Sequence, residues 1–520
     1  MTAVQDQPGR DGARWARADG YVGGVRTRPE RWAAVTNPAD VAETVGEYAV
    51  SSGRDVDAAV RAAHDAFPEW RALGARRRAE LMADAAGELE KLAADLAPVI
   101  SLEVGKVVAE SRVDASGAVG LLRAFAALSD LAERELDVSD DEASRPATSA
   151  RIRRVPVGPV AVIPPWNTPV YLTFNMLAPA LISGCTVVVK PPEVAPLAVS
   201  AMLRRCAELL PPGVLNVVPG TGDEAGEALT RHELVRGILF TGGVASGRRV
   251  LEAAASTVKK VSLELGGNDP AIVLESATVD DELLRELVAG TFSSSGQICY
   301  NVKRVYVHRS RYDELVDGLA QMLGGLVVGD PFDPDVHMGP LTTRAGYDRA
   351  HRLLADAERE GARVLHRGVR AGSAKWADGL YVYPVLVTGV PSYAELVVEE
   401  QFAPVLPILP FDTDDEAVAE ANRTEYGLGS SVWSDDVGHA ETVAERVEAG
   451  NTFINVHRVG ASVASVPFGG VKRSGLGRNH REYSLASCTE EHAIVHIEQP
   501  HSRLPGITRW ENLSTGGPDR

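Results

Sequence analysis

Hydrophobic residues follow a helical period in the first quarter of this chain. Between residues 55 and 128, apolar side chains recur at spacings of three and four with charged residues between them, as in VDAAVRAAHDAFPEWRAL and RRRAELMADAAGELEKLAADLAPVI. This period predicts amphipathic helices. Pro68 is expected to break or kink the first of them, because proline lacks the N–H that a helix interior requires.

From residue 159 the pattern changes to short apolar runs separated by helix-like segments. PVAVI, CTVVVK, VLNVV, GILFTG and KKVSLEL form one series of predicted strands, and PAIVL, RVYVH and NTFINV belong to a second series. Strands that alternate with helices are typical of a doubly wound parallel sheet. We therefore predict an α/β fold with two such series, divided near Gly266 and Gly267.

Residues 136–158, LDVSDDEASRPATSARIRRVPVG, follow neither pattern, because the segment is polar at first and then alternates. It predicts an exposed hairpin or strand, an arm of the kind that often needs a partner chain. Residues 1–20 and 501–520 are polar and contain glycine and proline, so we expect both ends to be flexible.

Composition narrows the class of protein. A chain of 520 residues exceeds the size at which one hydrophobic core stops growing, so two or three domains are expected. The net charge of -18 argues against a nucleic-acid partner. The four cysteines lack the spacing of a metal site or a disulfide framework. Without a signal sequence or a long apolar run, a cytoplasmic protein with no membrane partner is expected.

Two glycine-rich loops each stand between a predicted strand and a predicted helix. VVPGTGDEAGEAL contains Gly222, and LFTGGVASGRRV contains Gly242 and Gly243. Glycines let the backbone approach a phosphate, and the start of the following helix offers free N–H donors. Each loop alone could be a plain turn, but the two together favour a dinucleotide site.

The stretch VVVKPPEVAPL places Lys190 at the end of a predicted strand and Glu193 just before a helix. At the carboxyl edge of a doubly wound sheet, an ammonium and a carboxylate can bind the ribose hydroxyls of a dinucleotide. The alternative is a solvated strand end followed by an acid that the helix dipole favours.

Three further residues could carry chemistry. Cys299 ends the small, polar stretch SSSGQIC and could be a nucleophile or a packed thiol. Glu264 lies in the apolar run VSLELGG, where it could be a general base or face water. Asn167 lies between prolines in IPPWNTP, as an oxyanion donor or an ordinary turn residue. Together with a dinucleotide site, these groups would suit aldehyde oxidation through a thioester.

The order of these motifs resembles the aldehyde dehydrogenase superfamily, in its NAD(P)-dependent, non-acylating form. The resemblance covers residues 21–498 and rests on seven stretches, which are PWNTP, KPPE, FTGG, LELGGN, SGQIC, EEQFAPV and PFGGVKRSGLGR. It implies that Cys299 is the nucleophile, that Glu264 activates the hydrolytic water, and that Asn167 and the Cys299 backbone N–H bind the oxyanion.

The resemblance also implies the residues that bind cofactor and substrate. The implied cofactor residues are Lys190, Glu193, Gly222, Gly242, Gly243, Trp166, Leu265, Glu400 and Phe402. The implied substrate pocket contains Thr168, Tyr171, Asn175, Ile298, His457 and Phe468. NAD is expected rather than NADP, because Glu193 would repel a 2′-phosphate, and no metal is expected.

The implied organisation has a Rossmann-like NAD-binding domain at 21–135 and 158–265 and an α/β catalytic domain at 266–480. A small β oligomerisation arm would be formed by 136–157 and 481–500, so the resemblance implies a homodimer or homotetramer.

Several positions depart from the family pattern. Thr168 stands where an aromatic residue is common, Met176 where a lysine is common, and Ser294 where asparagine is usual. These changes suggest an altered, roomier or more polar pocket, and a medium-sized aromatic or terpenoid-like aldehyde as substrate. The alternatives are a CoA-acylating enzyme, against which Glu264 argues, and a non-catalytic binding protein on the same fold.

Overall fold

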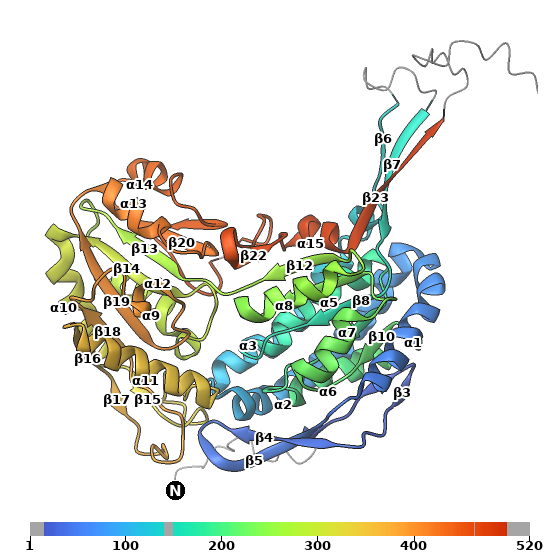
Figure 1. Ribbon diagram of the computed structural model, residues 1–520, viewed down its shortest axis with the longest axis horizontal. Coiled ribbons are helices and arrows are strands. Elements are labelled where there is room, and N and C mark those ends of the chain that lie inside the picture. The colour runs from blue at the N-terminus through green and yellow to red at the C-terminus, as the bar shows by residue number, and fades with distance from the viewer. Residues whose placement is uncertain (1–14, 140–148, 462, 497–520) are drawn as a thin grey trace, which may run out of the picture.

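The first predicted series of strands forms the centre of an eight-stranded sheet, here called the first sheet (Figure 1). The computed structural model describes residues 15–139, 149–461 and 463–496. In spatial order the strands are β22 (Gly475–Leu476), β12 (Lys260–Glu264), β11 (Gly237–Thr241), β8 (Val160–Ile163), β9 (Val187–Val189), β10 (Leu215–Val217), β2 (Tyr21–Val22) and β3 (Val25–Arg26). The five strands from β12 to β10 are parallel to one another, whereas β22 and β2 pair antiparallel at either end of them. The predicted α/β fold is confirmed.

The second series forms a seven-stranded sheet, here called the second sheet. Its strands in spatial order are β16 (Arg363–His366), β18 (Val385–Thr388), β19 (Val405–Phe411), β14 (Val302–His308), β13 (Asp269–Val273), β20 (Gly429–Trp433) and β21 (Asn451–Ile454). Only β16 is antiparallel to its neighbour within this sheet. The chain passes from the first sheet to the second between Glu264, where β12 ends, and Asp269, where β13 begins.

Helices cover both sheets (Figure 1). Around the first sheet lie α1 (Gly53–Ala72), α2 (Gly74–Val104), α3 (Val108–Ala126), α5 (Pro169–Ser183), α6 (Leu197–Ala207), α7 (Glu227–Arg231) and α8 (Val244–Ala255). The second sheet is accompanied by α9 (Asp281–Phe292), α10 (Tyr312–Leu323), α11 (Arg344–Arg359), α12 (Glu395–Val398), α13 (Asp414–Asn422) and α14 (Val437–Ala444). No helix among the described residues is both long and apolar enough to cross a bilayer.

Two expectations about the chain's first half need correction. Helix α1 continues through Pro68 to Ala72, because buried residues on both sides of the proline, Val60 and Trp70 among them, hold it against the core. The expected flexible start already contains strand β1 (Arg17–Ala18), which pairs with β5 (Asp40–Ala49). Residues 1–14 and the expected flexible tail at 501–520 lie outside the described residues.

Other elements were not predicted. Strand β4 (Trp32–Asn37) forms an antiparallel hairpin with β5. Helix α5 has buried residues nearly all round, so its sequence PVYLTFNMLAPALIS shows no amphipathic period. The structure also contains α4 (Ser129–Ala132) and a short parallel pair, β15 (Val327–Val328) with β17 (Val369–Arg370).

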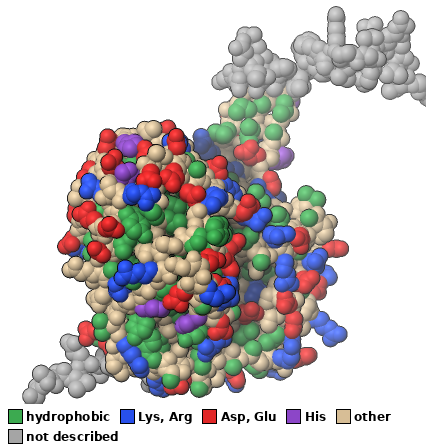
Figure 2. Space-filling model, turned by 60° about the vertical axis from the view of Figure 1, so that its left-hand side comes forward, with side chains coloured by type: hydrophobic (Ala, Val, Ile, Leu, Met, Phe, Trp, Pro, Cys, Tyr) green, Lys and Arg blue, Asp and Glu red, His purple; other side chains and the backbone are tan. Residues whose placement is uncertain are grey.

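A three-stranded antiparallel sheet projects from the body of the protein and is here called the arm (Figures 1 and 2). It consists of β6 (Glu135–Asp137), β7 (Ser149–Pro156) and β23 (Thr489–His496), with β7 in the middle. Helix α15 (Arg481–Cys488) leads directly into β23. The two strands of the predicted exposed hairpin, β6 and β7, are therefore present. Residues 140–148, between them, are not described.

The order of strands in the first sheet determines where a ligand can bind. After β8 the chain adds β9 and β10 on one side and then returns to add β11 and β12 on the other side. Such a reversal opens a crevice at the carboxyl ends of the strands. The loops that follow β8, β9, β11 and β12 contain Asn167, Lys190, Gly242 and Leu265, and all of them leave this edge.

Candidate active site

Lys190 and Glu193 lie beside the glycine loop that follows β10. The Lys190 ammonium is buried and donates to the carbonyls of Pro191, at 3.0 Å, and Gly220, at 2.8 Å. Burial lowers the pKa of this ammonium to about 8. The exposed Glu193 carboxylate accepts the backbone N–H of Gly222 at 3.2 Å. The two side chains that were predicted to bind a ribose therefore lie at one edge of the crevice.

The second glycine loop leaves the start of helix α8 open. Gly243 is the N-cap of α8, so no side chain caps the helix, and the first turn contains no acidic residue. A Cβ added to Gly222 or to Gly243 would meet nothing within 4 Å. Free N–H donors next to open space, at the positive end of a helix dipole, suit a diphosphate.

The loop before Cys299 adopts an unusual backbone. Ser294 and Ser295 have φ values of 50° and 55°, and Gly296 follows with 77°, so three consecutive residues are left-handed. Non-glycine residues seldom adopt this conformation, and asparagine does so more readily than serine. Neighbouring groups fix the turn, because the Glu110 carboxylate accepts the Ser294 N–H at 2.7 Å and the Ser295 hydroxyl donates to the Gly339 carbonyl at 2.9 Å.

Asn167 connects the loop after β8 to this turn. Its side-chain amide donates to the Gln297 carbonyl at 2.8 Å, which leaves the second amide N–H for a ligand. The buried ammonium of Lys106 holds the Asn167 main-chain carbonyl at 3.2 Å and pairs with Asp114 at 2.6 Å. Asp114 in turn accepts the Tyr171 N–H at 2.6 Å. A buried ion pair thus fixes the position of the predicted oxyanion donor.

Glu264 ends β12 and is 7% exposed, and neither of its carboxylate oxygens has a hydrogen-bond partner. Burial is the main reason that its pKa lies well above the ordinary value, and Arg478 opposes this rise. A carboxyl group in this state holds a proton more readily than an exposed one, which suits a general base.

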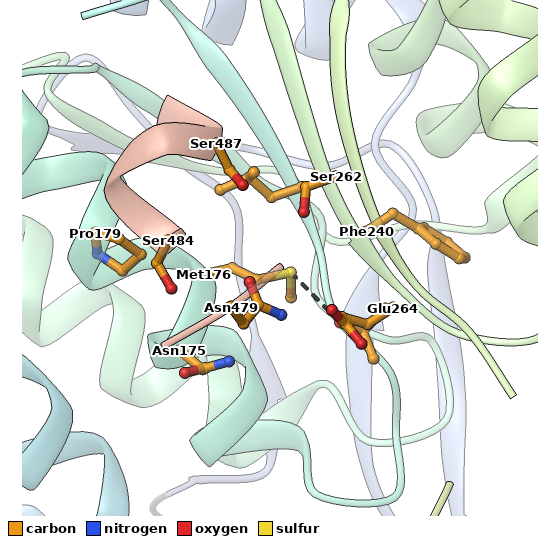
Figure 3. A pocket seen from close by; sticks show the side chains of 11 residues that line it. Asn175, Met176, Pro179, Phe240, Ser262, Glu264, Asn479, Ser484 and Ser487 are labelled. Atoms are coloured by element: carbon orange, nitrogen blue, oxygen red, sulfur yellow. Dashed lines mark hydrogen bonds between the residues drawn. The ribbon is translucent and has the colours of Figure 1, made fainter. Parts of the chain in front are cut away.

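A cavity of about 10 Å³ borders Glu264 (Figure 3), which is room for about one water. Asn175 and Met176 from α5 line it together with Asn479 and Ser484. The sulfur of Met176 accepts a hydrogen bond from Thr241 at 3.7 Å. Asn175 was predicted in the substrate pocket but contributes to this cavity behind Glu264, which Cys299 does not line.

Gly266 and Gly267 lie between two functional groups. A Cβ on Gly266 would come within 2.2 Å of a Glu400 carboxylate oxygen, and a Cβ on Gly267 within 2.7 Å of the Cys299 carbonyl. The Gly267 N–H donates to Glu400 at 3.2 Å. Burial raises the pKa of Glu400 to about 7. The glycine pair therefore lets Glu400 and the Cys299 loop approach the same backbone from two sides.

Aromatic side chains gather on both sides of the Cys299 loop. Trp166 and Phe402 meet edge to face, with ring centroids 5.5 Å apart. Tyr300 meets Phe468 in the same way at 5.6 Å, and Tyr171 lies near enough to raise the pKa of Tyr300. Thr168 is half-buried beside Asn167, while Ile298 and Leu265 are buried.

His457 does not line an open pocket, which corrects the expectation from the sequence. Its side chain is fully buried, and its two ring nitrogens contact the Tyr300 carbonyl at 2.8 Å and the Ser431 hydroxyl at 2.9 Å. The Asp269 carboxylate lies 3.6 Å away. His457 therefore holds the backbone next to Cys299 in place through the Tyr300 carbonyl.

Cys299 itself is half-buried, whereas the other three cysteines are buried. Burial raises the pKa of its thiol to about 12 in the protein without ligands. Among the described residues, no group of three or more His, Cys, Asp or Glu side chains could hold a metal ion.

Sequence reasoning missed the residues that support this loop, namely Lys106, Glu110 and Lys303. Lys106 and Lys303 are buried and Glu110 is partly buried, and Lys303 lies with Arg304 in the buried strand VKRVYVH. Burying a charge costs free energy unless it has a partner. The lysine within this strand could therefore have been recognised from the sequence as a residue with a specific role.

Residues 25–494 match the model of the aldehyde dehydrogenase family. The chain is 35% identical over 450 residues to aminoaldehyde dehydrogenase 1, peroxisomal, of Pisum sativum, covering 85% of this chain and 88% of that protein. It is 34% identical over 459 residues to succinate-semialdehyde dehydrogenase [NADP(+)] of Escherichia coli, covering 88% and 92%. Betaine aldehyde dehydrogenase of Staphylococcus aureus, solved with NAD+, has a TM-score of 0.88 at 28% identity, covering 97% of this chain and 99% of that one. This chain therefore belongs to the aldehyde dehydrogenase family, a family of oxidoreductases that oxidise aldehydes.

Proposed function

We propose that this protein oxidises an aldehyde to the carboxylic acid with NAD+, through a thiohemiacetal and then a thioester on Cys299. The observation that carries the proposal is the convergence of Cys299, Glu264 and Asn167 from three separate segments. The Glu264 charge is near enough to raise the pKa of the Cys299 thiol. Asn167 donates to Gln297, two residues before Cys299.

In the first step, the Cys299 thiol gives its proton to Glu264 and the sulfur forms a bond to the aldehyde carbon. The carbonyl oxygen becomes an oxyanion, which the Asn167 amide and the Cys299 backbone N–H stabilise. NAD+ held by Glu400 and Phe402 would supply the acceptor for the hydride of the same carbon, whose loss turns the thiohemiacetal into the thioester. The proton on Glu264 then passes to solvent, which frees the carboxylate for the next step.

In the second step, Glu264 takes a proton from water while the water oxygen bonds to the thioester carbon. The carbon–sulfur bond breaks, the carboxylic acid leaves, and the electron pair returns to the sulfur of Cys299. A carboxyl group whose pKa is raised by burial is a stronger base than an exposed one, which suits this task.

The residues at the crevice fit a dinucleotide. The uncapped start of α8 and the open space over Gly222 and Gly243 suit the diphosphate. Glu400, next to Gly267, would bind the nicotinamide ribose, and Phe402 would contact the ring. Trp166 and Leu265 would complete this end of the site. The S. aureus relative was solved with NAD+, whereas the E. coli relative is named for NADP(+).

We propose NAD+ rather than NADP+ for this chain. Glu193 is exposed beside Gly222, where it would accept hydrogen bonds from ribose hydroxyls and repel a 2′-phosphate.

The substrate that fits best is a medium-sized aldehyde with an aromatic or terpenoid-like apolar group. Tyr171, Tyr300 and Phe468 gather beside Cys299, and such rings pack against apolar groups. The three relatives are named for three different aldehydes, so they favour none of them here.

The first prediction concerns Cys299→Ala. We expect no NADH formation with any aldehyde of an aliphatic, aromatic and terpenoid panel, because no other described cysteine is accessible. The melting temperature and NAD+ affinity should remain those of the wild type. Cys206→Ala, at a buried thiol in α6, is the control and should remain active. A Cys299→Ala protein that turns over would disprove the proposal.

The second prediction concerns Glu264→Gln. Acylation should be slower, because the first step also uses this base, but it should still give about one NADH per active site. Steady-state turnover should fall about 10²- to 10⁴-fold, the usual contribution of a general base. In the wild type, turnover should rise with pH through the pKa of Glu264, because the deprotonated carboxylate is the active form.

Absorbance at 340 nm after rapid mixing measures the NADH that forms in the first turnover. Glu103→Gln is the control, because it alters a buried carboxyl group on α2 that accepts the Leu197 and Ala198 N–H groups, away from Cys299. Wild-type turnover that requires coenzyme A would instead establish the acylating alternative.

The third prediction concerns Glu193→Ser. Wild-type kcat/KM should be higher with NAD+ than with NADP+, and the substitution should shift the ratio towards NADP+ by about ten-fold, since close like charges repel by ~1 kcal/mol or more. Glu445→Ser, at an exposed site beyond α14, should leave the ratio unchanged. A wild-type preference for NADP+ would refute the role of Glu193.

The fourth prediction concerns the arm. We propose that it pairs with a second copy to give a homodimer or homotetramer, because its Leu136 and Val495 are 42% and 58% exposed. Val495→Lys should shift the sedimentation coefficient towards the monomer. Val437→Lys, at a valine that is 50% exposed in α14, should not. A wild-type protein that sediments as a monomer would contradict the proposal.

A further inference from the structure

Lys303 lies beneath the Cys299 loop, near the start of β14. Its side chain is buried, with the residue 2% exposed. The ammonium donates to three main-chain carbonyls, those of Ile298 at 2.5 Å, Cys299 at 3.3 Å and Asn301 at 3.1 Å. One side chain thus holds the backbone on both sides of the reactive sulfur.

These three hydrogen bonds use all three N–H groups of the ammonium. None of the described carboxylates comes within 4.0 Å of it, so carbonyl dipoles alone contact the charge. A buried cation without a direct counter-ion is costly, and it favours a negative charge that forms close by.

The groups that face Cys299 are otherwise acidic. Asp269 on β13, Glu264 on β12 and Glu400 before β19 all raise the pKa of the thiol, and so does burial. Lys303 is the one cation, within the described part of the chain, whose charge lowers that pKa. The neighbouring phenol of Tyr300 is itself neutral, because burial raises its pKa.

The hydrogen bond from Lys303 to the Ile298 carbonyl also fixes the direction of the Cys299 backbone N–H. In a trans peptide unit, the carbonyl of one residue and the N–H of the next point in opposite directions. Because the Ile298 carbonyl points at Lys303, the Cys299 N–H points away from it. This N–H is the backbone donor that the proposed mechanism uses for the oxyanion.

We propose that Lys303 is a positioning residue for aldehyde oxidation, which holds the Cys299 N–H in its donor orientation and supplies the positive charge that stabilises the thiolate. The inference rests on the proposed function of Cys299 as nucleophile. Met176, which lines the cavity beside Glu264, has no charge to offer the sulfur, whereas the Lys303 ammonium contacts the Cys299 carbonyl itself. Its Nζ also lies 6.0 Å from the Phe402 ring centroid, on the cofactor side.

The test is the pH dependence of Cys299 alkylation by iodoacetamide in the full-length protein without cofactor, with the labelled peptide identified by mass spectrometry. In Lys303→Met the alkylation rate at pH 8 should fall about ten-fold or more, which corresponds to a rise of about one unit in the pKa of the thiol. Lys303→Arg keeps the charge and should keep the wild-type pH profile.

Arg304→Met is the matched control. Arg304 is the next residue, is also buried, and donates to the Asn268 and Ala421 carbonyls rather than to the Cys299 loop. Its loss should lower the melting temperature without changing the rate of Cys299 alkylation at pH 8. If Lys303→Met gives the same pH profile as Arg304→Met, the inference is overturned.

A second neutral variant, Lys303→Gln, guards against a Lys303→Met protein that does not fold. Equal alkylation profiles for Lys303→Gln and Lys303→Arg would also overturn the inference. The proposed function fails separately, if Cys299→Ala turns over aldehyde. An inactive Cys299→Ala with an unchanged Lys303→Met profile would reject the role of Lys303 alone.

Discussion

The hydrogen bond from the Asn167 amide to the Gln297 carbonyl joins the two halves of the proposed catalytic centre. Asn167 follows a strand of the first sheet, and Gln297 precedes a strand of the second, so this contact sets how the proposed oxyanion donor faces Cys299. The segment from the end of α2 into α3 supports both partners, because Lys106 holds the Asn167 carbonyl and Glu110 holds the turn before Gln297. The proposed chemistry therefore depends on a contact between the two sheets, which the charged side chains of Lys106 and Glu110 hold in place.

The same region is buried and rich in carboxyl groups. Burial raises the pKa of Glu264 and brings that of Glu400 to about 7, so Glu400 can exchange a proton near neutral pH. Perturbed groups of this kind concentrate at functional sites. The buried ammonium of Lys303 opposes this excess of acid, and it contacts backbone carbonyls rather than a carboxylate. Its charge therefore stays available to the sulfur.

Local patterns predicted much of this picture, and distant contacts account for the rest. The strands and the motifs around Glu264 and Cys299 are short and read directly from neighbouring residues, so the α/β fold and the candidate catalytic residues could be predicted. The sequence could not reveal that His457 lies under the loop, because its partners are far away along the chain. The role of Lys303 likewise appears only when the loop folds back over it. The predicted break at Pro68 is absent, because tertiary packing outweighs the local effect of the proline on the helix.

Gly266 and Gly267 leave no room for even a methyl group between Glu400 and the Cys299 carbonyl. A substitution at Gly266 would displace the Glu400 carboxylate, and one at Gly267 would displace the Cys299 carbonyl. The dipeptide lies where the chain passes from the first sheet to the second. For protein engineering it is therefore a poor place to add a side chain, even one as small as that of alanine.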